Sequence, residues 1–171
     1  AAEIEAAGGR ARAHPCDVGD PAAVEELVRA ADAVAPLAVL VTAAGLNRTG
    51  PAAAYATADW DLLMDVNVRG TFVACRAVGR RMIERGAGGR IVTLSSQMGS
   101  VGYPGRAAYC ASKHAVNGMT KALAVEWAPY AITVNAVAPT FVDTPLTRPM
   151  FEDPEFAADV RSRIPGGELA A

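Results

Sequence analysis

Short apolar runs alternate along this chain with segments long enough to form helices. Uninterrupted apolar runs of this kind are typical of strands buried on both faces of a parallel sheet. A further extended segment lies within RARAHPCDV and ends at Asp17. We therefore predict this early strand and three later ones, in PLAVLVTAAG (36–45), GRIVTLSS (89–96) and AITVNAVAP (131–139).

Helix signals fill the intervals between these runs. An early Pro21 follows an acidic start, and apolar residues then recur at helical spacing. Thr57 is a candidate helix cap and Gly86 a candidate stop. The opening residues resemble the tail of a helix, and further helices are predicted over residues 20–34, 58–85, 105–130 and about 154–163.

The order of these elements predicts one α/β domain over residues 1–171. Short connections imply right-handed crossovers and a parallel sheet with helices on both faces. We predict a doubly wound, Rossmann-like sheet that is incomplete at both ends. Ligands of such folds bind beyond the carboxyl ends of the strands, so reactive residues are expected there.

Composition excludes several classes of partner. The formal net charge is −2 and the arginines are scattered, which argues against nucleic acid. No apolar run reaches the length of about 18 residues that a membrane span needs, so no membrane is expected. Cys16, Cys75 and Cys110 are odd in number and lack a C-x-x-C spacing, which predicts neither a disulfide framework nor a metal site. A reducing cytoplasm fits this pattern.

Tyr109 and Lys113 carry the main chemical signal. Positions i and i+4 of a helix lie on one face, so both side chains can reach a common ligand. A phenol has a pKa near 10 and is a poor base at neutral pH. A neighbouring ammonium and a cationic cofactor ring would lower that pKa and make Tyr109 a general acid/base. Ser96 follows a predicted strand, where its hydroxyl could hold a substrate oxygen.

The chain resembles the classical short-chain dehydrogenase/reductase family. The family's Ser, thirteen-residue gap and Tyr-x-x-x-Lys pattern matches Ser96, Tyr109 and Lys113. Its other marks appear in order as CDV, TAAG, DVNVRG and APTFVDTP. The resemblance covers nearly the whole chain and implies an oxidoreductase that interconverts a secondary alcohol and a ketone with NAD or NADP.

The resemblance also implies a role for each matching residue. Ser96 would polarise the substrate oxygen, Tyr109 would exchange the proton, and Lys113 would hold the nicotinamide ribose and lower the pKa of the tyrosine. Asn67 would position a relay water. With Tyr109 and Lys113, the cofactor-binding residues would be Asp17, Val18, Ala43, Ala44, Gly45, Pro139, Val142 and Thr144.

Parts of the family pattern are absent from this sequence. The glycine-rich T-G-x-x-x-G-x-G turn, the first strand and the residue that selects NAD or NADP are not found, and neither are the last strand and helix. Backbone amides of that turn would cradle the pyrophosphate, so weak cofactor binding is expected. We expect the chain to be a piece of a longer protein that forms a homotetramer or dimer.

Residues 140–165 are rich in proline and predict a lid over a small-molecule alcohol or ketone. Polyols and sugars are the substrates that the resemblance favours.

Taken singly, Ser96 could instead cap a turn, Asn67 could be a satisfied polar residue, and Asp17 could serve turn chemistry.

Two other functions stay open at this point. One is a domain that keeps the fold for association and has lost turnover. The other is a nucleotide-sugar epimerase or dehydratase of the extended branch, which uses the same Tyr-Lys chemistry. The greater length of that branch and the APTFVDTP segment argue against it.

Overall fold

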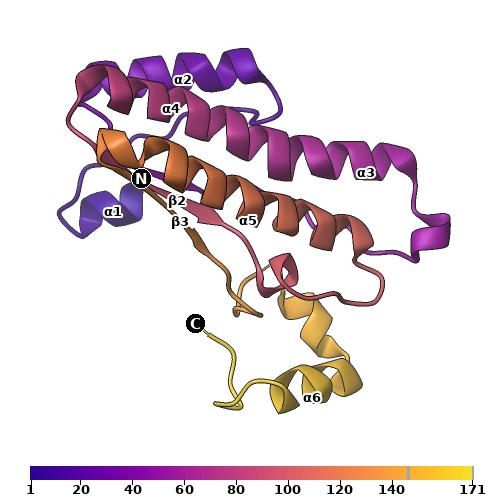
Figure 1. Ribbon diagram of the computed structural model, residues 1–171. Helices are drawn as coiled ribbons and strands as arrows, with labels where there is room; N and C mark the ends of the chain where they lie inside the picture. Colours follow the sequence, from indigo (N-terminus) through magenta and orange to yellow (C-terminus); the bar gives the residue numbers. More distant parts are fainter. Residues whose placement is uncertain (146, 171) are drawn as a thin grey trace.

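The computed structural model describes residues 1–145 and 147–170. Its sheet contains, within these residues, the parallel strands β1 (Val39–Thr42), β2 (Gly89–Leu94) and β3 (Ile132–Val137), in that spatial order. Val39 pairs with Arg90 across the first ladder, and Gly89 pairs with Ile132 across the second. All carboxyl ends therefore meet at one edge of the sheet (Figure 1).

The strands are connected by long helices. The chain passes from β1 to β2 through α3 (Thr57–Met64), a π-helical segment η2 (Asp65–Gly70) and α4 (Thr71–Arg85), which form one continuous rod (Figure 1). It passes from β2 to β3 through α5 (Ala107–Trp127). The remaining elements are α1 (Ala2–Ala6), α2 (Pro21–Val34), α6 (Pro154–Ser162) and the 3₁₀ turns η1 (Ala52–Ala54), η3 (Gln97–Gly99), η4 (Ala128–Tyr130) and η5 (Arg148–Glu152).

Local sequence accounts for several helix ends. The carboxylate of Asp20 accepts hydrogen bonds from the amides of Ala22 and Ala23 and so caps α2, as its acidic start predicts. Gly86 ends α4 with a φ of 68°, a left-handed conformation that glycine adopts without steric cost. The prediction of a Thr57 cap is wrong, because the cap position is Ala56 and no side chain bonds to the helix end there.

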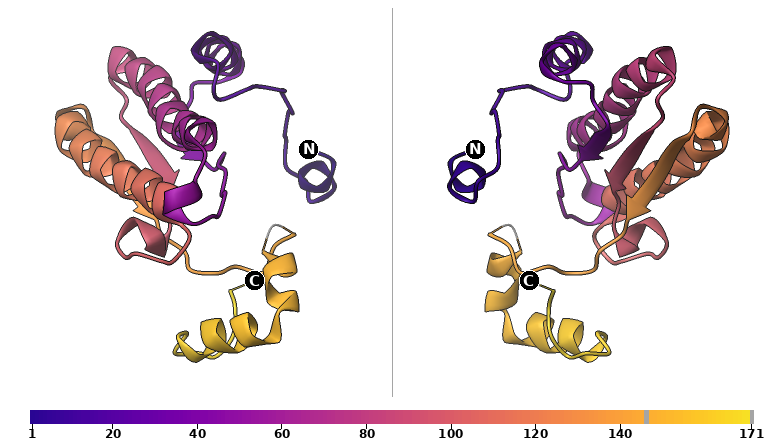
Figure 2. Two further views of the ribbon diagram at one scale, coloured as in Figure 1. Left: turned by 90° about the vertical axis from the view of Figure 1, so that its right-hand side faces the viewer. Right: turned by 90° about the vertical axis from the view of Figure 1, so that its left-hand side faces the viewer.

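The main core lies between the sheet and the helices α2, α4 and α5. It includes Val28 of α2, Met82 of α4, Trp127 of α5 and Ile91 of β2. Gly79 allows α4 to approach α5, since a Cβ there would lie 2.6 Å from the indole of Trp127. These contacts fix α4 and α5 side by side on the same side of the sheet (Figure 2).

The α/β class with a Rossmann-like parallel sheet is confirmed. The other face of the sheet is nevertheless exposed among the described residues: Val39 is 57% and Val41 56% exposed, although both-sided burial was predicted. The physical reason is topological. Strands β1, β2 and β3 follow one direction across the sheet, and right-handed crossovers then place both connections on the same face.

The predicted strand ending at Asp17 is also wrong. Residues 9–17 are assigned to no strand, helix or turn. A strand is stable only when its backbone groups pair with a neighbour, and the described residues offer this segment none. The segment therefore follows α1 as an irregular connection to α2. Within the described residues no helix is both long and apolar enough to cross a membrane.

A second, smaller core lies beyond the carboxyl edge of the sheet. Phe141, Phe151 and Phe156 contact one another edge to face, with ring centroids 5.5–5.6 Å apart. Met98 and Val160 complete its buried centre, and the ring of Tyr109 packs against it. This cluster attaches η5 and α6 to the edge of the sheet where the candidate site lies.

Candidate active site

Tyr109 and Lys113 lie in the first two turns of α5, on one face, as their spacing predicts. The Lys113 ammonium is 5.6 Å from the centroid of the Tyr109 ring. Its Nζ donates a 2.7 Å hydrogen bond to the carbonyl of Leu94, the last residue of β2. The start of α5 is thus attached to the carboxyl end of the central strand, and the pair is held there.

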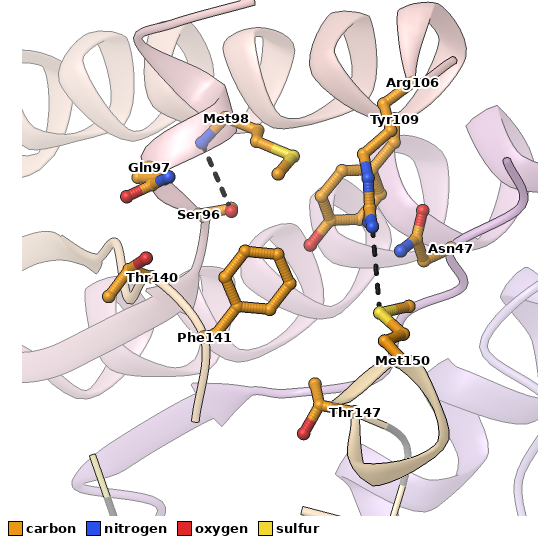
Figure 3. A pocket seen from close by; sticks show the side chains of 10 residues that line it. All are labelled: Asn47, Ser96, Gln97, Met98, Arg106, Tyr109, Thr140, Phe141, Thr147 and Met150. Atoms are coloured by element: carbon orange, nitrogen blue, oxygen red, sulfur yellow. Dashed lines mark hydrogen bonds between the residues drawn. The ribbon is translucent and has the colours of Figure 1, made fainter. Parts of the chain in front are cut away.

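Ser96 follows β2 and is the N-cap residue of η3. Its Oγ accepts a 3.2 Å hydrogen bond from the amide of Met98, so the serine does cap a turn. Ser96 and Tyr109 line the same cavity, and their hydroxyl groups point into it (Figure 3). The structural and the catalytic interpretations of Ser96 are therefore compatible, because capping fixes the direction of its hydroxyl.

The lowered pKa expected for Tyr109 depends on a cationic cofactor ring as well as on Lys113, and it stays a prediction. Burial raises the pKa of Tyr109, while the Ser96 hydroxyl and the positive charge of Arg106 lower it to a smaller extent. Burial also lowers the pKa of Lys113, whose hydrogen bond goes to the backbone of β2. The charge of Arg106, three residues upstream, thus favours ionisation of the phenol.

Asn67 lies in η2 and is 1% exposed. Its Nδ2 donates to the carbonyl of Leu46 at 2.9 Å and to Oγ of Ser112 at 3.1 Å, and its Oδ1 accepts from the amide of Leu46 at 2.7 Å. The side chain thereby joins the loop after β1 to α5. Both amide hydrogens are used, so the side chain is a satisfied polar residue that positions this loop.

Several predicted cofactor residues lie around the same edge. A Cβ on Gly45 would lie 3.4 Å from Oδ1 of Asn67 and 3.9 Å from Nζ of Lys113, which places the TAAG loop beside the lysine. The carbonyl of Pro139 accepts from the amide of Gln97 at 3.0 Å. Val142 forms a bridge with Ala170 in the segment that follows β3.

The other predicted residues have structural partners of their own. The hydroxyl of Thr144 is 3.1 Å from that of Thr147. Asp17 accepts a hydrogen bond from the amide of Gly19 at 2.8 Å, which is the turn chemistry named as its alternative. Val18 packs against Gly70 at the end of η2, where a Cβ on that glycine would lie 3.0 Å from the Val18 carbonyl.

A nicotinamide cofactor fits the lysine end of this site. Among the described residues Lys113 donates one hydrogen bond, so two of its three N–H groups can still donate to hydroxyl groups of a ligand. The adjacent Gly45 has no side chain that would fill the space beside the ammonium. Lys113, Tyr109 and the TAAG loop are therefore the residues that could hold a ribose.

Residue patterns alone missed several groups in the cavity. Arg106, Asn47 and Met150 line it together with Ser96 and Tyr109 (Figure 3). Arg106 is the N-cap residue of α5, so its nearness to Tyr109 in the sequence was the available signal. No sequence signal predicted that Met150 approaches the cavity, because its position depends on how the segment after β3 folds back.

Comparison with known proteins decides the family. Residues 1–155 match the family model described as short chain dehydrogenase. This chain belongs to that family. It is 41% identical over 174 residues to the D-threitol dehydrogenase of Mycolicibacterium smegmatis, an alignment that covers 99% of this chain and 65% of the relative. It is 47% identical over 141 residues to a galactitol 2-dehydrogenase (L-tagatose-forming) of Cereibacter sphaeroides, covering 81% of this chain and 55% of the relative.

Solved members of the family share the architecture. The gluconate 5-dehydrogenase of Burkholderia cenocepacia, in complex with NADP and tartrate, superposes with a TM-score of 0.93 at 33% identity. That superposition covers 99% of this chain and 66% of the other. The chain thus spans about two thirds of the length of these dehydrogenases, and the similarity extends over almost all of it.

Proposed function

We infer that this chain carries the reaction centre of an NAD(P)-dependent oxidoreductase that interconverts a secondary alcohol and a ketone. The observation that supports this is the meeting of Ser96 and Tyr109 in one cavity, with Lys113 held beside the tyrosine. The family relationship and the relatives named as polyol and sugar-acid dehydrogenases favour the same chemistry. Polyols and sugar derivatives are the proposed substrate class.

In the oxidation direction the alcohol loses a proton and a hydride. The Ser96 hydroxyl orients the substrate oxygen, and the ionised Tyr109 oxygen accepts its proton. Bound NAD(P) supplies the acceptor for the hydride. In reduction the Tyr109 hydroxyl returns a proton to the carbonyl oxygen. Asn67 acts at a distance, by fixing the loop that follows β1.

Cofactor contacts are proposed for the residues that match the family pattern. Lys113 would bind the nicotinamide ribose, and the backbone of Ala43, Ala44 and Gly45 would face the adenosine ribose. The remaining proposed contacts are Asp17 and Val18 with the adenine, and Pro139, Val142 and Thr144 near the nicotinamide.

Residues 140–165 are proposed to act as the substrate lid. Phe141 and Met150 of this segment line the cavity, and the three packed phenylalanines hold it against Tyr109. Because one side of this segment is packed and the other lines the cavity, the segment would set the shape of the substrate pocket. The part of this segment at residue 146 lies outside the described residues.

A homo-oligomer is proposed for the full-length protein. The helices α3, α4 and α5 expose large apolar side chains, among them Trp60, Leu62, Phe72 and Val125. Exposed apolar groups on long helices are suited to association between identical subunits. The three free thiols, Cys16, Cys75 and Cys110, support a reducing, cytoplasmic location.

The proposal is tested by nicotinamide absorbance during turnover of secondary alcohols, with Tyr109→Phe as the diagnostic variant. We expect Tyr109→Phe to lower kcat by about 10²- to 10⁴-fold, the typical contribution of a general acid/base. Tyr130→Phe is the matched control, since Tyr130 is exposed in η4. Wild-type turnover in Tyr109→Phe would refute the assignment, and a wild-type protein that folds and binds NAD(P) without any turnover would favour the association domain.

A further inference from the structure

The candidate cavity contains one charged side chain among its described lining residues, and this is Arg106. Arg106 is 7% exposed, yet no carboxylate of the described residues lies within ion-pair distance of it. Its Nη2 donates to the thioether of Met150 at 3.7 Å, a weak acceptor. A buried guanidinium with five N–H donors is therefore left with little hydrogen bonding.

The surroundings of Arg106 hold it in place without neutralising it. Its guanidinium carbon is 5.4 Å from the centroid of the Tyr103 ring and 5.8 Å from that of Phe141. Aromatic faces attract a cation but accept no strong hydrogen bonds. Because burial of a charge is costly unless it is paired, a group of opposite charge entering the cavity would recover this cost.

Asn47 is a neutral polar residue that lines the cavity close to Arg106. The Oδ1 of Asn47 is buried and accepts no hydrogen bond from the described residues. Asn47 and Arg106 lie on the same side of the cavity, with Met150 next to them, while Ser96 lies on the other side (Figure 3). The oxygen of Asn47 is enclosed by protein atoms and its amide nitrogen faces the cavity, so the cavity offers the guanidinium of Arg106 beside a neutral N–H donor.

We propose that the substrate is a hydroxy acid whose carboxylate binds Arg106. The carbon that reacts is then the secondary alcohol carbon held by Ser96 and Tyr109, and the carboxylate is unchanged by the reaction. One guanidinium matches the single charge of a carboxylate, whereas a phosphate ester would carry close to two. An aldonate combines these groups. This proposal rests on the proposed oxidoreductase function.

The test compares acids with their uncharged counterparts on the full-length protein. Substrates are a panel of aldonates, including D-threonate and D-gluconate, with the matching amides and alditols. We expect kcat/KM for the preferred aldonate to exceed that for its amide by about 10- to 150-fold, the value of a hydrogen bond to a charged group. Equal or better turnover of every amide or alditol would overturn the proposal, as would a preference for sugar phosphates.

Variants separate recognition from stability. Arg106→Gln should abolish the preference for the acid, measured as the ratio of kcat/KM for the aldonate to kcat/KM for the alditol, and Arg106→Lys should restore part of it. Any effect of the substitution on the pKa of Tyr109 acts on both substrates and cancels in this ratio. Arg85→Gln is the matched control, because Arg85 is a partly buried arginine at the far end of α4 that pairs with Asp32. An equal loss with acid, amide and alditol in Arg106→Gln would show a structural role and overturn the proposal.

A binding measurement keeps this proposal distinct from the proposed function. The rise in Tm on addition of aldonate or amide is measured for wild type and Arg106→Gln, with NADP present. Protection by aldonate alone, lost in Arg106→Gln, would support the carboxylate site even if no substrate turned over. Absence of protection by every aldonate would overturn it, even if the protein oxidised neutral alcohols.

Discussion

Removal of the Asn67 side chain should loosen the loop that follows β1. Asn67 makes three hydrogen bonds, two of them with the backbone of Leu46 and one with Ser112. In Asn67→Ala the amide and the carbonyl of Leu46 lose their partner together. The same loop carries Gly45, next to Lys113, and Asn47, which lines the cavity.

The magnitude follows from the groups left unpaired. A buried polar group without its partner costs about 1–3 kcal/mol. Leu46 is only half-buried, so water can replace part of the loss, and we expect about 2–4 kcal/mol for the two groups. For a domain of this size that corresponds to a fall in Tm of about 5–15 °C.

The assay combines urea unfolding with amide hydrogen exchange. Unfolding gives the total change in stability, and exchange shows whether protection is lost at Leu46 first. Asn67→Asp is the variant of similar size, which keeps an acceptor for the Leu46 amide but turns a second acceptor toward the Leu46 carbonyl. It should be destabilised as well, because a repulsive contact replaces a hydrogen bond.

Asn117→Ala is the matched control. Asn117 donates one 2.8 Å hydrogen bond to the carbonyl of Gly99, so its loss should cost only about 1 kcal/mol. An Asn67→Ala protein within about 0.5 kcal/mol of wild type, or one with unchanged protection of the Leu46 amide, would refute the positioning role.

Gly79→Ala should destabilise the protein by about 1–3 kcal/mol through contact with Trp127, despite a gain of up to about 1 kcal/mol in helix propensity. In urea unfolding of the double variant, Trp127→Phe should relieve part of this loss. A stabilised Gly79→Ala would contradict the contact. Burial raises the pKa of Cys75 to about 12. The folded pKa is therefore above the unfolded value of 9.0. The thiol's contribution to stability is fully present below pH 9 and is lost by about 1.4 kcal/mol per pH unit between pH 9 and the folded pKa; Cys75→Ala should lack this decline in urea unfolding. The charge of Arg106 lowers the pKa of Tyr109. Arg106→Gln should therefore shift the pH at which kcat/KM rises, measured on a neutral polyol, to a higher value. A shift to lower pH would exclude that coupling.

Local signals in the sequence determined most of the elements. Asp20 and Pro21 define the start of α2, and Gly86 defines the end of α4, because capping and left-handed turns depend on residues within a few positions of each other. The four-residue spacing of Tyr109 and Lys113 placed them on one helix face for the same reason. The position of Ser96 after β2 followed from the apolar run that precedes it.

Only the tertiary structure decided how these local pieces act on one another. The exposed face of β1 depends on the direction in which strands are added to the sheet, which the alternation of strands and helices leaves open. Asn67 bonds to a residue twenty-one positions away, and Arg106 meets Met150 forty-four positions away. Burial of Tyr109 likewise depends on segments that are distant in the sequence. It raises the pKa of the phenol, an effect that the four-residue spacing to Lys113 does not reveal. The spacing of residues along the sequence indicates which of them share a face of a helix or strand. The burial of a side chain and its pKa depend instead on the distant residues that the folded chain brings into contact with it.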